Sequence, residues 1–572
     1  MTLSGSQSSY VCGATTEPLL YQTVGGALAR AAERWPARDA LIASHQGERL
    51  TYRELDARVE RLARALTASG LRPGDRLGIW APNCVEWVLV QFATARAGIV
   101  LVNVNPAYRT AELRFVLQKS GCRALVLAVS FKSSNYIEML RSMLPAASLT
   151  GAGRVDCPEL PALELVVHLA PDDIAGFLSF GALMARAGDP AGAELPESTD
   201  PDQPINIQFT SGTTGLPKGA TLTHFNIVNN GYFVGRALCL TEQDRICIPV
   251  PLYHCFGMVL GVLAAVTHGA CVVFPGGSFE AEAVLRCAAE ERCTALYGVP
   301  TMFIAELEHP GFARFDLSSL RTGIMAGAPC PMEIMRRVMD EMHMSQITIC
   351  YGMTETSPVS FQSAVDDPVE KRVGTVGRVH PHVQVKVVDA DGNPVRRGET
   401  GELCTRGYSV MRGYWEEPER TAEAIDAAGW MHTGDLAVLD EEGYCYIVGR
   451  VKDMIIRGGE NIYPREIEEF LYGHPKLLDV AVVGVSDGKY GEEVCAVIRL
   501  REGICADAEE IRAYCRGQIA HYKVPRYVRF VDAFPMTVTG KVQKFVLRQR
   551  IEAELGGGRN DRPDVGDSPA DG

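Results

Sequence analysis

The chain has 572 residues, and 56 lysines and arginines against 70 aspartates and glutamates give it a formal net charge of −14. This acidic balance argues against a general nucleic-acid binder, because such proteins carry basic surfaces. At roughly 150 residues per domain the length predicts about three or four structural units, and 47% hydrophobic with 22% charged residues is typical of a folded globular protein.

Signals for a membrane or secretory protein are weak. The longest apolar stretch, Met258–Val266, is much shorter than the roughly 20 residues that cross a bilayer, so we expect it to be a buried segment. The first 25 residues lack a charged region followed by an apolar one. The 17 cysteines are scattered and include no CxxC pair, which favours reduced core residues. We therefore expect a cytoplasmic protein with no transmembrane segment.

The N-terminal part alternates between helix and strand. Residues 51–71 are predicted to form a helix that opens with a capping box of Thr51 and Glu54. A strand at Arg76–Trp80, a helix at Ala111–Lys119 and a strand at Ala124–Ala128 follow. Such alternation predicts an α/β fold with largely parallel sheets.

Further along, the pattern changes twice. Between about 383 and 450 short period-2 strands and tight turns, such as Val383–Val388 and Tyr444–Val448, predict a small antiparallel β unit. After residue 450 a compact α+β domain is expected, with the predicted elements Val480–Gly484, Val494–Ile498, a helix near Glu509–Ala520, and Tyr527–Phe530. The tail Gly556–Gly572 has no apolar periodicity, so we expect disorder.

A glycine-rich run, Thr210–Gly219, follows the predicted strand Ile205–Phe209. Its glycines let backbone N–H groups approach an anion, its hydroxyls donate, and Lys218 adds a positive charge, which together predict a polyphosphate-binding loop. The spacing is not that of a Walker loop, because Lys218 precedes Gly219 and only two residues separate the first two glycines. A flexible surface loop is the alternative interpretation.

This run resembles the phosphate loop of the adenylate-forming (AMP-binding) superfamily, which includes acyl-CoA synthetases, firefly luciferase and peptide-synthetase adenylation domains. Six further blocks resemble the family's motifs and occur in the family's order. The first three are the aromatic/His motif Pro251–Gly257 and the adenine-binding and metal-proximal segments Gly327–Pro329 and Tyr351–Thr356. The others are the ribose-binding motif Trp430–Asp435, the hinge Gly449–Asp453 and the C-terminal lysine motif Pro535–Lys541. Within the superfamily the sequence most resembles the medium-chain fatty acyl-CoA ligases, including the segment Ser9–Gly13.

The resemblance implies a large N-terminal domain of stacked α/β sheets plus the small antiparallel β unit, joined by a hinge to the small α+β C-terminal domain. The implied parts are an N-terminal arm (1–18), an adenylate-forming domain (19–451) with a β-rich subdomain (about 376–451), a mobile C-terminal domain (452–555) and the tail (556–572). Lys452 occupies the hinge position.

The resemblance also implies the nucleotide site, with ATP or AMP bound by Thr210, Ser211, Gly212, Thr213, Thr214, Gly215, Lys218, Gly327, Ala328, Pro329, Tyr351, Gly352, Met353, Thr354, Asp435, Arg450 and Lys541. Glu355 is a plausible Mg²⁺ ligand with Thr214, although a Thr-Glu-Thr triplet on its own is usually a helix cap or turn. Asp435 can accept hydrogen bonds from both ribose hydroxyls, and Tyr351 would stack on adenine. A solvated aspartate and a core aromatic are the alternatives.

The remaining implied roles concern the acyl group and the thiol. Lys541 would contact the acyl carboxylate and the α-phosphate, although read alone it is a solvated lysine. His254 would gate the acyl carboxylate and the thiol, with a structural histidine as the alternative. The expected neighbours of CoA are Arg457, Gly458 and Gly459, and the expected acyl-pocket residues, which could equally be core, are Phe256, Val299, Pro300 and Met302. The expected catalytic residues are Lys541, Lys218, His254 and Glu355.

These patterns favour an ATP-dependent acid–thiol ligase that forms an acyl-adenylate from a medium- or longer-chain fatty acid and transfers the acyl group to coenzyme A, with Mg²⁺ as cofactor. An aryl-acid (hydroxycinnamate-like) CoA ligase, and an adenylating enzyme that loads a carrier protein in trans, are rivals. A nucleotide-binding regulator without chemistry is a rival of another class, which the retained charged residues disfavour. The oligomeric state stays open, with a homodimer as one candidate.

Overall fold

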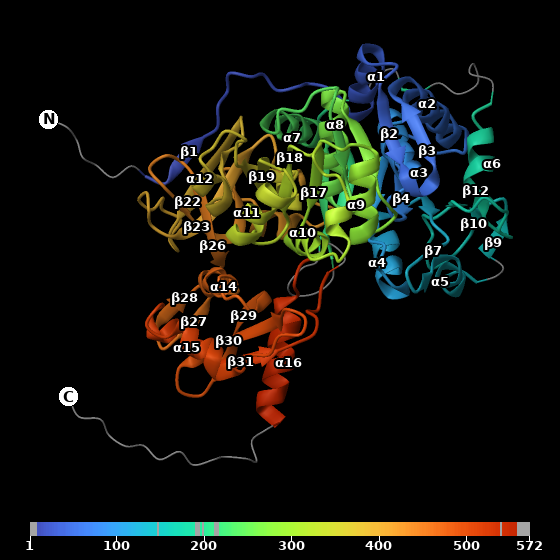
Figure 1. Cartoon of the computed structure of the whole chain (residues 1–572). Helices are drawn as coiled ribbons and strands as arrows, with labels where there is room; N and C mark the ends of the chain where they lie inside the picture. The colour runs from blue at the N-terminus through green and yellow to red at the C-terminus, as the bar shows by residue number, and fades with distance from the viewer. Residues whose placement is uncertain are drawn as a thin grey trace, which may run out of the picture. The chain divides into compact units, whose positions relative to one another are not determined.

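A computed structural model describes residues 8–145, 148–188, 195–196, 200–210, 217–537 and 540–557. The chain forms two compact units (Figure 1). The larger contains Met1–Thr433 and Ala437–Ile447, and the smaller contains Gly434–Leu436 and Val448–Gly572.

The larger unit contains a nine-stranded sheet whose middle is parallel. Its order is β21 (Arg378–Val379), β20 (Val359–Gln362), β19 (Gln346–Gly352), β18 (Thr322–Ala326), β17 (Ala295–Gly298), β15 (Arg245–Cys247), β16 (Cys271–Phe274), β2 (Asp39–Ala43) and β3 (Glu48–Thr51). Strands β19 to β2 in this order run parallel, and the strands at the two ends join them antiparallel. The carboxyl ends of six strands therefore share one edge.

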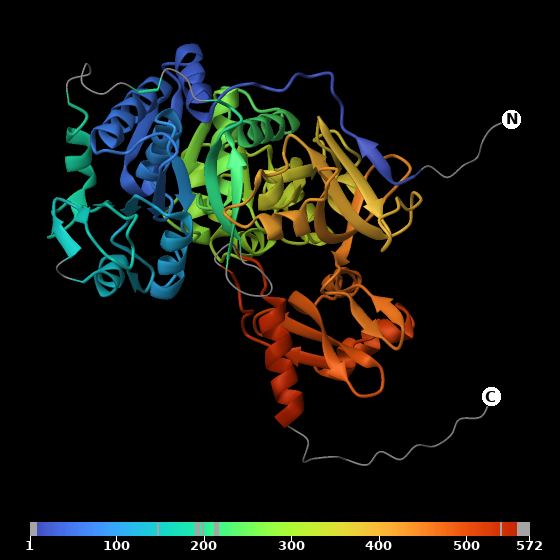
Figure 2. The same cartoon turned by 180° about the vertical axis from the view of Figure 1, so that it is seen from behind.

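A second large sheet has the path β24 (Gly413–Tyr414), β14 (Lys218–Thr223), β13 (Pro204–Thr210), β5 (Val100–Asn103), β4 (Arg76–Trp80), β6 (Ala124–Leu127), β11 (Leu165–His168), β10 (Arg154–Val155) and β9 (Leu149–Gly151), with β12 (Leu178–Ser179) beside β11. Strands β13, β5, β4, β6 and β11 are parallel, whereas β14 is antiparallel to both β13 and β24. Figure 2 shows the same structure from behind.

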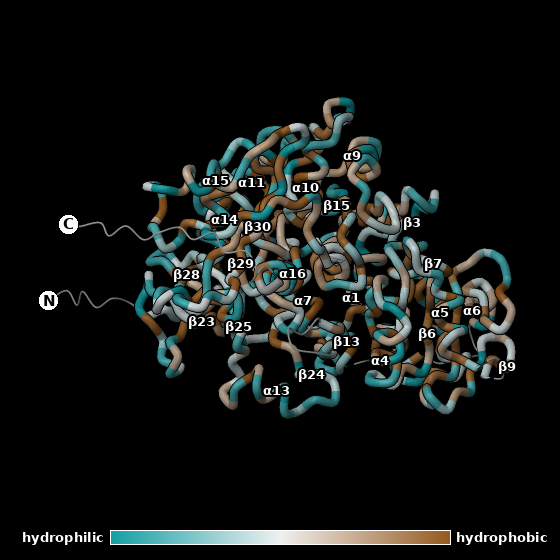
Figure 3. The backbone as a smooth tube through the Cα atoms, turned by 90° about the horizontal axis from the view of Figure 1, so that it is seen from below, coloured by the Kyte–Doolittle hydropathy of each residue, from teal (hydrophilic) through white to brown (hydrophobic). Residues whose placement is uncertain are grey.

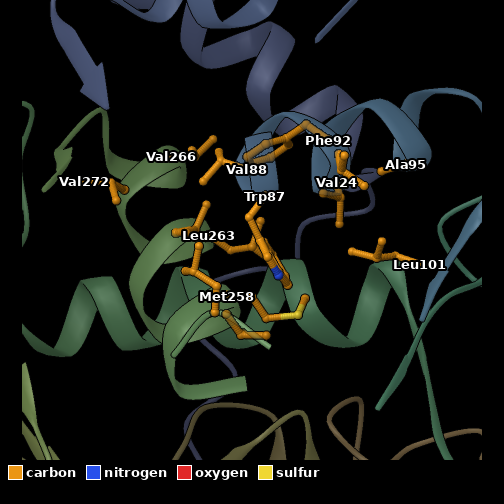
Figure 4. Close-up of a cluster of buried hydrophobic side chains, with 14 of the residues drawn as sticks. Val24, Trp87, Val88, Phe92, Ala95, Leu101, Met258, Leu263, Val266 and Val272 are labelled. Carbon is orange, nitrogen blue, oxygen red and sulfur yellow. The ribbon is translucent and has the colours of Figure 1, made fainter. Parts of the chain in front are cut away.

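Helices with apolar side chains fill the core of the larger unit. They include α1 (Val24–Arg34), α2 (Tyr52–Ala68), α3 (Val85–Arg96), α7 (His224–Ala237), a π-helix (Phe256–Leu263) and α8 (Ala264–His268). Trp87 and Phe92 of α3 pack in one buried cluster with Met258 and Leu263 of the π-helix and Leu101 of β5 (Figure 4). In contrast, α13 (Pro418–Ala424) has no buried residue and is mainly hydrophilic in Figure 3.

A third sheet has the order β1 (Tyr10–Cys12), β22 (Val383–Val388), β23 (Gly401–Gly407), β25 (Met431–Leu439) and β26 (Cys445–Arg450). The pairs β1–β22 and β22–β23 are antiparallel. The N-terminal segment thus adds an edge strand to the small β unit that the sequence predicts.

The smaller unit is an α+β fold. Its sheet has the order β28 (Glu460–Ile462), β27 (Ile455–Arg457), β30 (Gly491–Leu500) and β29 (Leu477–Asp487), and β31 (Tyr527–Phe530) pairs parallel with β30. The helices are α14 (Pro464–Tyr472), α15 (Ala508–Cys515) and α16 (Lys544–Gly557). Apolar residues of α14, α15, β29 and β30 form its main core cluster.

The α/β fold class and most predicted elements are confirmed. The capping box is present, because the Thr51 hydroxyl accepts from the Glu54 N–H and the Glu54 carboxylate accepts from the Thr51 N–H. The strands Arg76–Trp80, Val383–Val388 and Tyr527–Phe530 have the predicted bounds. The segment 258–266 is buried as expected, but most of it is π-helix. All cysteines except Cys12, Cys239 and Cys505 are buried.

Two predicted boundaries are wrong. The helix expected at 509–520 ends at Cys515, because Arg516 is extended and Gly517 has a φ of +73°. The predicted tail is too long, since Gly556 and Gly557 belong to α16; the remaining tail residues lie outside the described part of the chain. No helix among the described residues is long and apolar enough to cross a membrane.

Candidate active site

Four of the sequence segments singled out above meet at the carboxyl edge of the nine-stranded sheet. Pro251–Gly257 follows β15, Val299 follows β17, and Gly327–Pro329 follows β18, while Tyr351 lies at the end of β19. Ala326, the last residue of β18, pairs with Cys350, so Tyr351 and Gly352 of β19 extend just beyond the end of β18. Ligands of parallel α/β sheets bind outside the carboxyl ends of the strands. The fold therefore brings the expected acyl and adenine segments to one edge.

The glycine-rich run connects two antiparallel strands. Thr210, the last residue of β13, pairs with Lys218, the first residue of β14, and its hydroxyl donates to the Lys218 carbonyl at 3.5 Å. Ser211, Gly212, Thr213, Thr214 and Gly215 lie outside the described residues. A strand, and not a helix, follows the loop, in agreement with the distinction from a Walker loop. The Lys218 ammonium lies 4.9 Å from the ring centroid of Tyr414.

Glu355 is a buried carboxylate. It lies in a 3₁₀ turn (Thr354–Thr356) and is only 6% exposed. The hydroxyl of Tyr414 donates to Glu355 Oε1 at 2.9 Å, which provides a partner that a buried carboxylate needs. Burial, together with the nearby Glu355 charge, raises the pKa of Tyr414 well above its ordinary value, so the hydroxyl is the donor. Carboxylate oxygens are ligands that Mg²⁺ prefers, and Glu355 fits that role.

His254 lies just before the π-helix, and π-helical turns are frequent at functional sites. Its Nδ1 accepts the Phe256 N–H at 3.1 Å, which leaves the proton of a neutral ring on Nε2. A Cβ at Gly257 would lie 2.5 Å from the Pro251 carbonyl oxygen, so the tight turn requires glycine there. The aromatic/His motif is thereby held in one conformation.

Two buried polar residues that the sequence analysis missed anchor this motif. Asn103 of β5 donates to the Tyr253 carbonyl at 2.9 Å. Gln208 of β13 accepts from the Cys255 thiol at 3.1 Å. An amide side chain within a buried strand is the signal that could have revealed them, since buried polar groups are normally hydrogen-bonded.

The expected acyl-pocket residues lie close together. Phe256, Val299 and Met302 are 2–6% exposed and belong to one apolar cluster. The Phe256 ring lies 6.0 Å from that of Tyr297, and Pro300 is the first residue of α10 (Pro300–Leu307). Their arrangement fits an apolar pocket wall and core packing equally well.

The adenine segments are partly exposed. Gly327 has a φ of +87° in the turn after β18, and Ala328 and Pro329 follow it. The Tyr351 ring lies 6.2 Å from Phe361. A Cβ at Gly352 would lie 1.7 Å from the Pro358 carbonyl oxygen, so glycine is required there as well. The next two residues, Met353 and Thr354, lead into the turn that carries Glu355.

In the smaller unit, Arg450 Nε donates to Asp435 Oδ1 at 3.0 Å. The Asp435 side chain is 9% exposed and that of Arg450 is 56% exposed. Both residues are expected on one nucleoside, and the structure brings them into contact. Lys452 follows in an exposed turn in which the Arg450 carbonyl accepts from the N–H groups of residues 453 and 454.

The segment expected beside CoA is a β-hairpin turn. Arg457 pairs with Glu460 across Gly458 and Gly459, whose φ values are +59° and +92°. This geometry requires glycines irrespective of any ligand. Arg457 Nε donates to Glu493 Oε2 at 2.8 Å, and this bond raises the pKa of Arg457.

Lys541 lies in a turn of the smaller unit. Its N–H donates to the Thr537 hydroxyl at 3.0 Å, and its carbonyl accepts the Thr537 N–H at 2.8 Å. Gly540 has a φ of +78° and donates to the Thr537 carbonyl. The backbone of the turn is thus held from both sides, directly before α16.

A separate mixed cluster lies on the third sheet. His432 Nδ1 is 3.0 Å from Glu402 Oε2 and 3.5 Å from the Cys404 sulfur. Burial raises the pKa of Cys404 to about 12, so its thiol carries a proton at neutral pH. A hydrogen-bonded cluster accounts for these distances.

Comparison with known proteins decides the family. The pattern of the AMP-binding enzymes matches residues 28–415, and that of the AMP-binding enzyme C-terminal domain matches residues 466–541. The chain belongs to the AMP-binding enzyme family. The family resemblance inferred from the sequence motifs is thereby confirmed.

Several members of the family match almost the whole chain. The mitochondrial medium-chain acyl-CoA ligase ACSF2 of Danio rerio is 49% identical over 554 residues, which cover 96% of this chain and 91% of the relative. The anthranilate CoA ligase AuaEII, solved with anthranoyl-AMP, has a TM-score of 0.85 at 27% identity and covers 94% of this chain and 99% of that one. ATP-bound MatB of Rhodopseudomonas palustris has a TM-score of 0.79 at 30% identity, with 92% and 99% covered.

Proposed function

We propose that this protein is an AMP-forming acyl-CoA synthetase. It activates a medium- or longer-chain fatty acid with ATP to acyl-AMP and pyrophosphate, and it then transfers the acyl group to coenzyme A with release of AMP. The 49% identity to a medium-chain acyl-CoA ligase supports the reaction class. The observation that carries the proposal is the meeting of the acyl and adenine segments at one sheet edge, with a buried carboxylate beside them.

In the first half-reaction a carboxylate oxygen of the acid forms a bond to the α-phosphorus of ATP, and the bond from that phosphorus to the pyrophosphate oxygen breaks. Both reactants are anions, so cations must offset their repulsion and the charge that develops in the transition state. Lys218 and Lys541 supply two of these charges. Glu355, with Thr214 by family resemblance, would hold the Mg²⁺ that neutralises phosphate charge when it is bound.

The groups that hold the nucleoside act by hydrogen bonding and stacking and take no part in the bonds that form and break. Asp435 accepts from the ribose hydroxyls, because a carboxylate offers acceptors only and a vicinal diol offers two donors. Arg450 orients that carboxylate through its 3.0 Å hydrogen bond. Tyr351 supplies a face for the adenine, while Gly327, Ala328, Pro329, Gly352, Met353 and Thr354 form the surrounding backbone.

In the second half-reaction the thiol of CoA gives up its proton to solvent and its sulfur attacks the acyl carbonyl, the bond to the AMP oxygen breaks, and AMP leaves with the electron pair. The smaller unit presents Arg457, Gly458 and Gly459 to CoA in this step, and it rotates about Lys452 between the two half-reactions. His254 gates the passage of the acid and the thiol. No residue forms a covalent intermediate with the acyl group, because the adenylate is already the activated species.

A fatty acid is favoured over an aryl acid because the side chains of Phe256, Val299 and Met302, with Pro300, have no N or O atom that could hydrogen-bond a ring hydroxyl. The aryl alternative corresponds to a more distant relative, AuaEII, at 27% identity. The buried thiols support a reducing compartment such as the cytoplasm, since reduced cysteines persist there.

The deciding experiment measures exchange of labelled pyrophosphate into ATP without a thiol, followed by AMP release with CoA. Both are run with saturated acids of graded length and with hydroxycinnamate-type acids. We expect exchange that depends on a fatty acid and AMP release that requires CoA. ATP binding without exchange would contradict the proposal and support a nucleotide-binding regulator. Exchange without CoA-dependent turnover would point to a carrier protein as acceptor.

A further inference from the structure

Tyr414 contacts two residues of the proposed site, although the sequence analysis did not select it. Its side chain is buried, with 8% of the residue exposed. Its hydroxyl donates to Glu355 Oε1 at 2.9 Å, and its ring centroid lies 4.9 Å from the Lys218 ammonium. One neutral side chain therefore contacts both the carboxylate and the lysine of the polyphosphate region.

The contact with Lys218 follows from strand register. Tyr414 of β24 lies opposite Ala220 of the antiparallel strand β14. Lys218 is two residues before Ala220, so both side chains point to the same face of the sheet. Side chains diagonally opposite on one face are within reach of each other when one is aromatic or long. The pairing of β24 with β14 thus places the ring beside the ammonium.

The backbone around Tyr414 is attached to both partners. The Trp415 N–H donates to the Gly219 carbonyl at 2.7 Å on the Lys218 side. The Met411 N–H donates to the Glu355 carbonyl at 2.8 Å on the other side. A Cβ at Gly413 would lie 2.9 Å from the Thr421 side chain, so the chain passes close to α13 there. The position of the ring is therefore fixed by the sheet, the Glu355 turn and α13 together.

We propose that Tyr414 is a positioning residue that holds Glu355 for a divalent cation and Lys218 for the polyphosphate. The proposal rests on the proposed function. A tyrosine suits this role because its hydroxyl orients a carboxylate without cancelling its charge, and its ring face attracts an ammonium without neutralising it. A lysine, arginine or carboxylate at the same place would neutralise one of the two charges that the substrate requires.

The test measures ATP affinity by calorimetry, with Mg²⁺ and again with EDTA, on Tyr414→Phe and Tyr414→Leu. Tyr414→Phe keeps the ring and loses the hydroxyl. We expect its affinity for ATP in Mg²⁺ to fall about 10- to 100-fold, the usual range for a hydrogen bond to a charged group, while its affinity in EDTA stays at the wild-type value. Tyr414→Leu should also weaken binding in EDTA, by roughly 2- to 5-fold, because the ring contact with Lys218 is lost.

Tyr444→Phe is the matched control. Tyr444 is a buried tyrosine whose hydroxyl also donates to a carboxylate, Asp367 Oδ1, at 2.6 Å, and neither residue belongs to the proposed site. We expect wild-type ATP affinity in both media. Equal magnesium dependence in Tyr414→Phe, Tyr444→Phe and the wild type would overturn the proposal. Both Tyr414 variants lack the hydroxyl, so either variant can be used for the test if the other does not fold.

A double-mutant cycle separates positioning from general packing. In a Glu355→Gln background the charge that the hydroxyl orients is absent, so adding Tyr414→Phe should cost less than twofold further affinity in Mg²⁺. An undiminished loss in that background would contradict the proposal. A wild-type protein that forms no acyl-CoA would instead refute the proposed function. The magnesium dependence of ATP binding would still test the positioning role of Tyr414.

Discussion

The proposed polyphosphate-binding residues of the larger unit and the cations near the hinge of the smaller unit are held in opposite ways. In the larger unit Glu355 is 6% exposed and Lys218 begins a strand, and both contact the buried Tyr414. In the smaller unit the Arg450 side chain is 56% exposed, and Lys452 lies in an exposed turn. Buried groups are oriented by packing and need little reorganisation during a reaction. Residues on exposed turns can exchange partners, which is what two successive half-reactions require.

The largest expected effect comes from removing the smaller unit's contribution to the first half-reaction. Lys541→Ala should lower fatty-acid-dependent pyrophosphate exchange by about 10²–10³-fold, the usual loss for one charge-stabilising group. Thioester formation from synthetic acyl-AMP and CoA should remain near the wild-type rate. Lys476→Ala, which changes a half-buried lysine of the same unit paired with Glu510 at 2.7 Å, is the control and should leave both rates intact. Equal loss of both half-reactions in Lys541→Ala would contradict the assignment.

A comparable change in the larger unit should affect every acid alike. Glu355→Ala and Lys218→Ala remove interactions with the polyphosphate and its cation, which all substrates share, so kcat/KM for adenylation should fall about 10²-fold at every chain length. The measurement is the exchange rate across a series of acids. A change restricted to chain-length preference would show that these residues serve the acyl chain instead.

The hinge can be tested with a proline. Lys452→Pro fixes φ near −65° at the residue expected to absorb the rotation, so the smaller unit should be trapped in one orientation. We expect acyl transfer from synthetic acyl-AMP to CoA to fall roughly 100-fold, the usual loss when reacting groups are held out of position, while pyrophosphate exchange persists. Retention of both half-reactions at wild-type rates would exclude Lys452 as the pivot.

Pocket variants should produce smaller and selective effects. A methylene in an apolar pocket is worth about 1–3 kcal/mol of discrimination, so Phe256→Ala, Val299→Ala and Met302→Ala should shift the optimum of a chain-length profile of kcat/KM. Val262→Ala is the matched control, because Val262 is 1% exposed in the same apolar cluster but was not predicted to line the pocket. Its profile should match the wild type. Unchanged profiles in all three pocket variants would place the acyl chain elsewhere.

The smallest effect concerns the stability of the larger unit in acid. Burial lowers the pKa of His380 to about 3. The unfolded chain binds this proton below about pH 6.5 and the folded chain does not, so the free energy of unfolding should fall as the pH drops from 6.5 toward 3. The contribution of His380 to the slope should be about 1.4 kcal/mol per pH unit. His380→Gln should reduce the slope by that amount in denaturant titrations between pH 6 and 4.5, while buried His224, whose pKa is also lowered to about 3, keeps its own contribution. An unchanged slope would contradict the assignment.

Local sequence features determined the secondary structure and the order of the family motifs. The capping box at Thr51, the strand Arg76–Trp80 and the alternation of Val383–Val388 depend on residues within one turn or one strand of each other. Interactions of that range are encoded in side-chain periodicity and capping chemistry. Boundaries such as Cys515 were missed where a turn residue ended a helix early.

Only the tertiary structure decided which distant residues share a site. The contact of Tyr414 with Lys218 depends on the register of β24 against β14, and the burial of Glu355 depends on the segment that crosses it. Neither the register of a strand pair nor the burial of a side chain leaves a local sequence pattern. A glycine, a tyrosine or a glutamate in a loop has the same sequence neighbours whether it faces solvent or another residue. The amides of Asn103 and Gln208 likewise became meaningful only once the folded chain placed the aromatic/His motif above them.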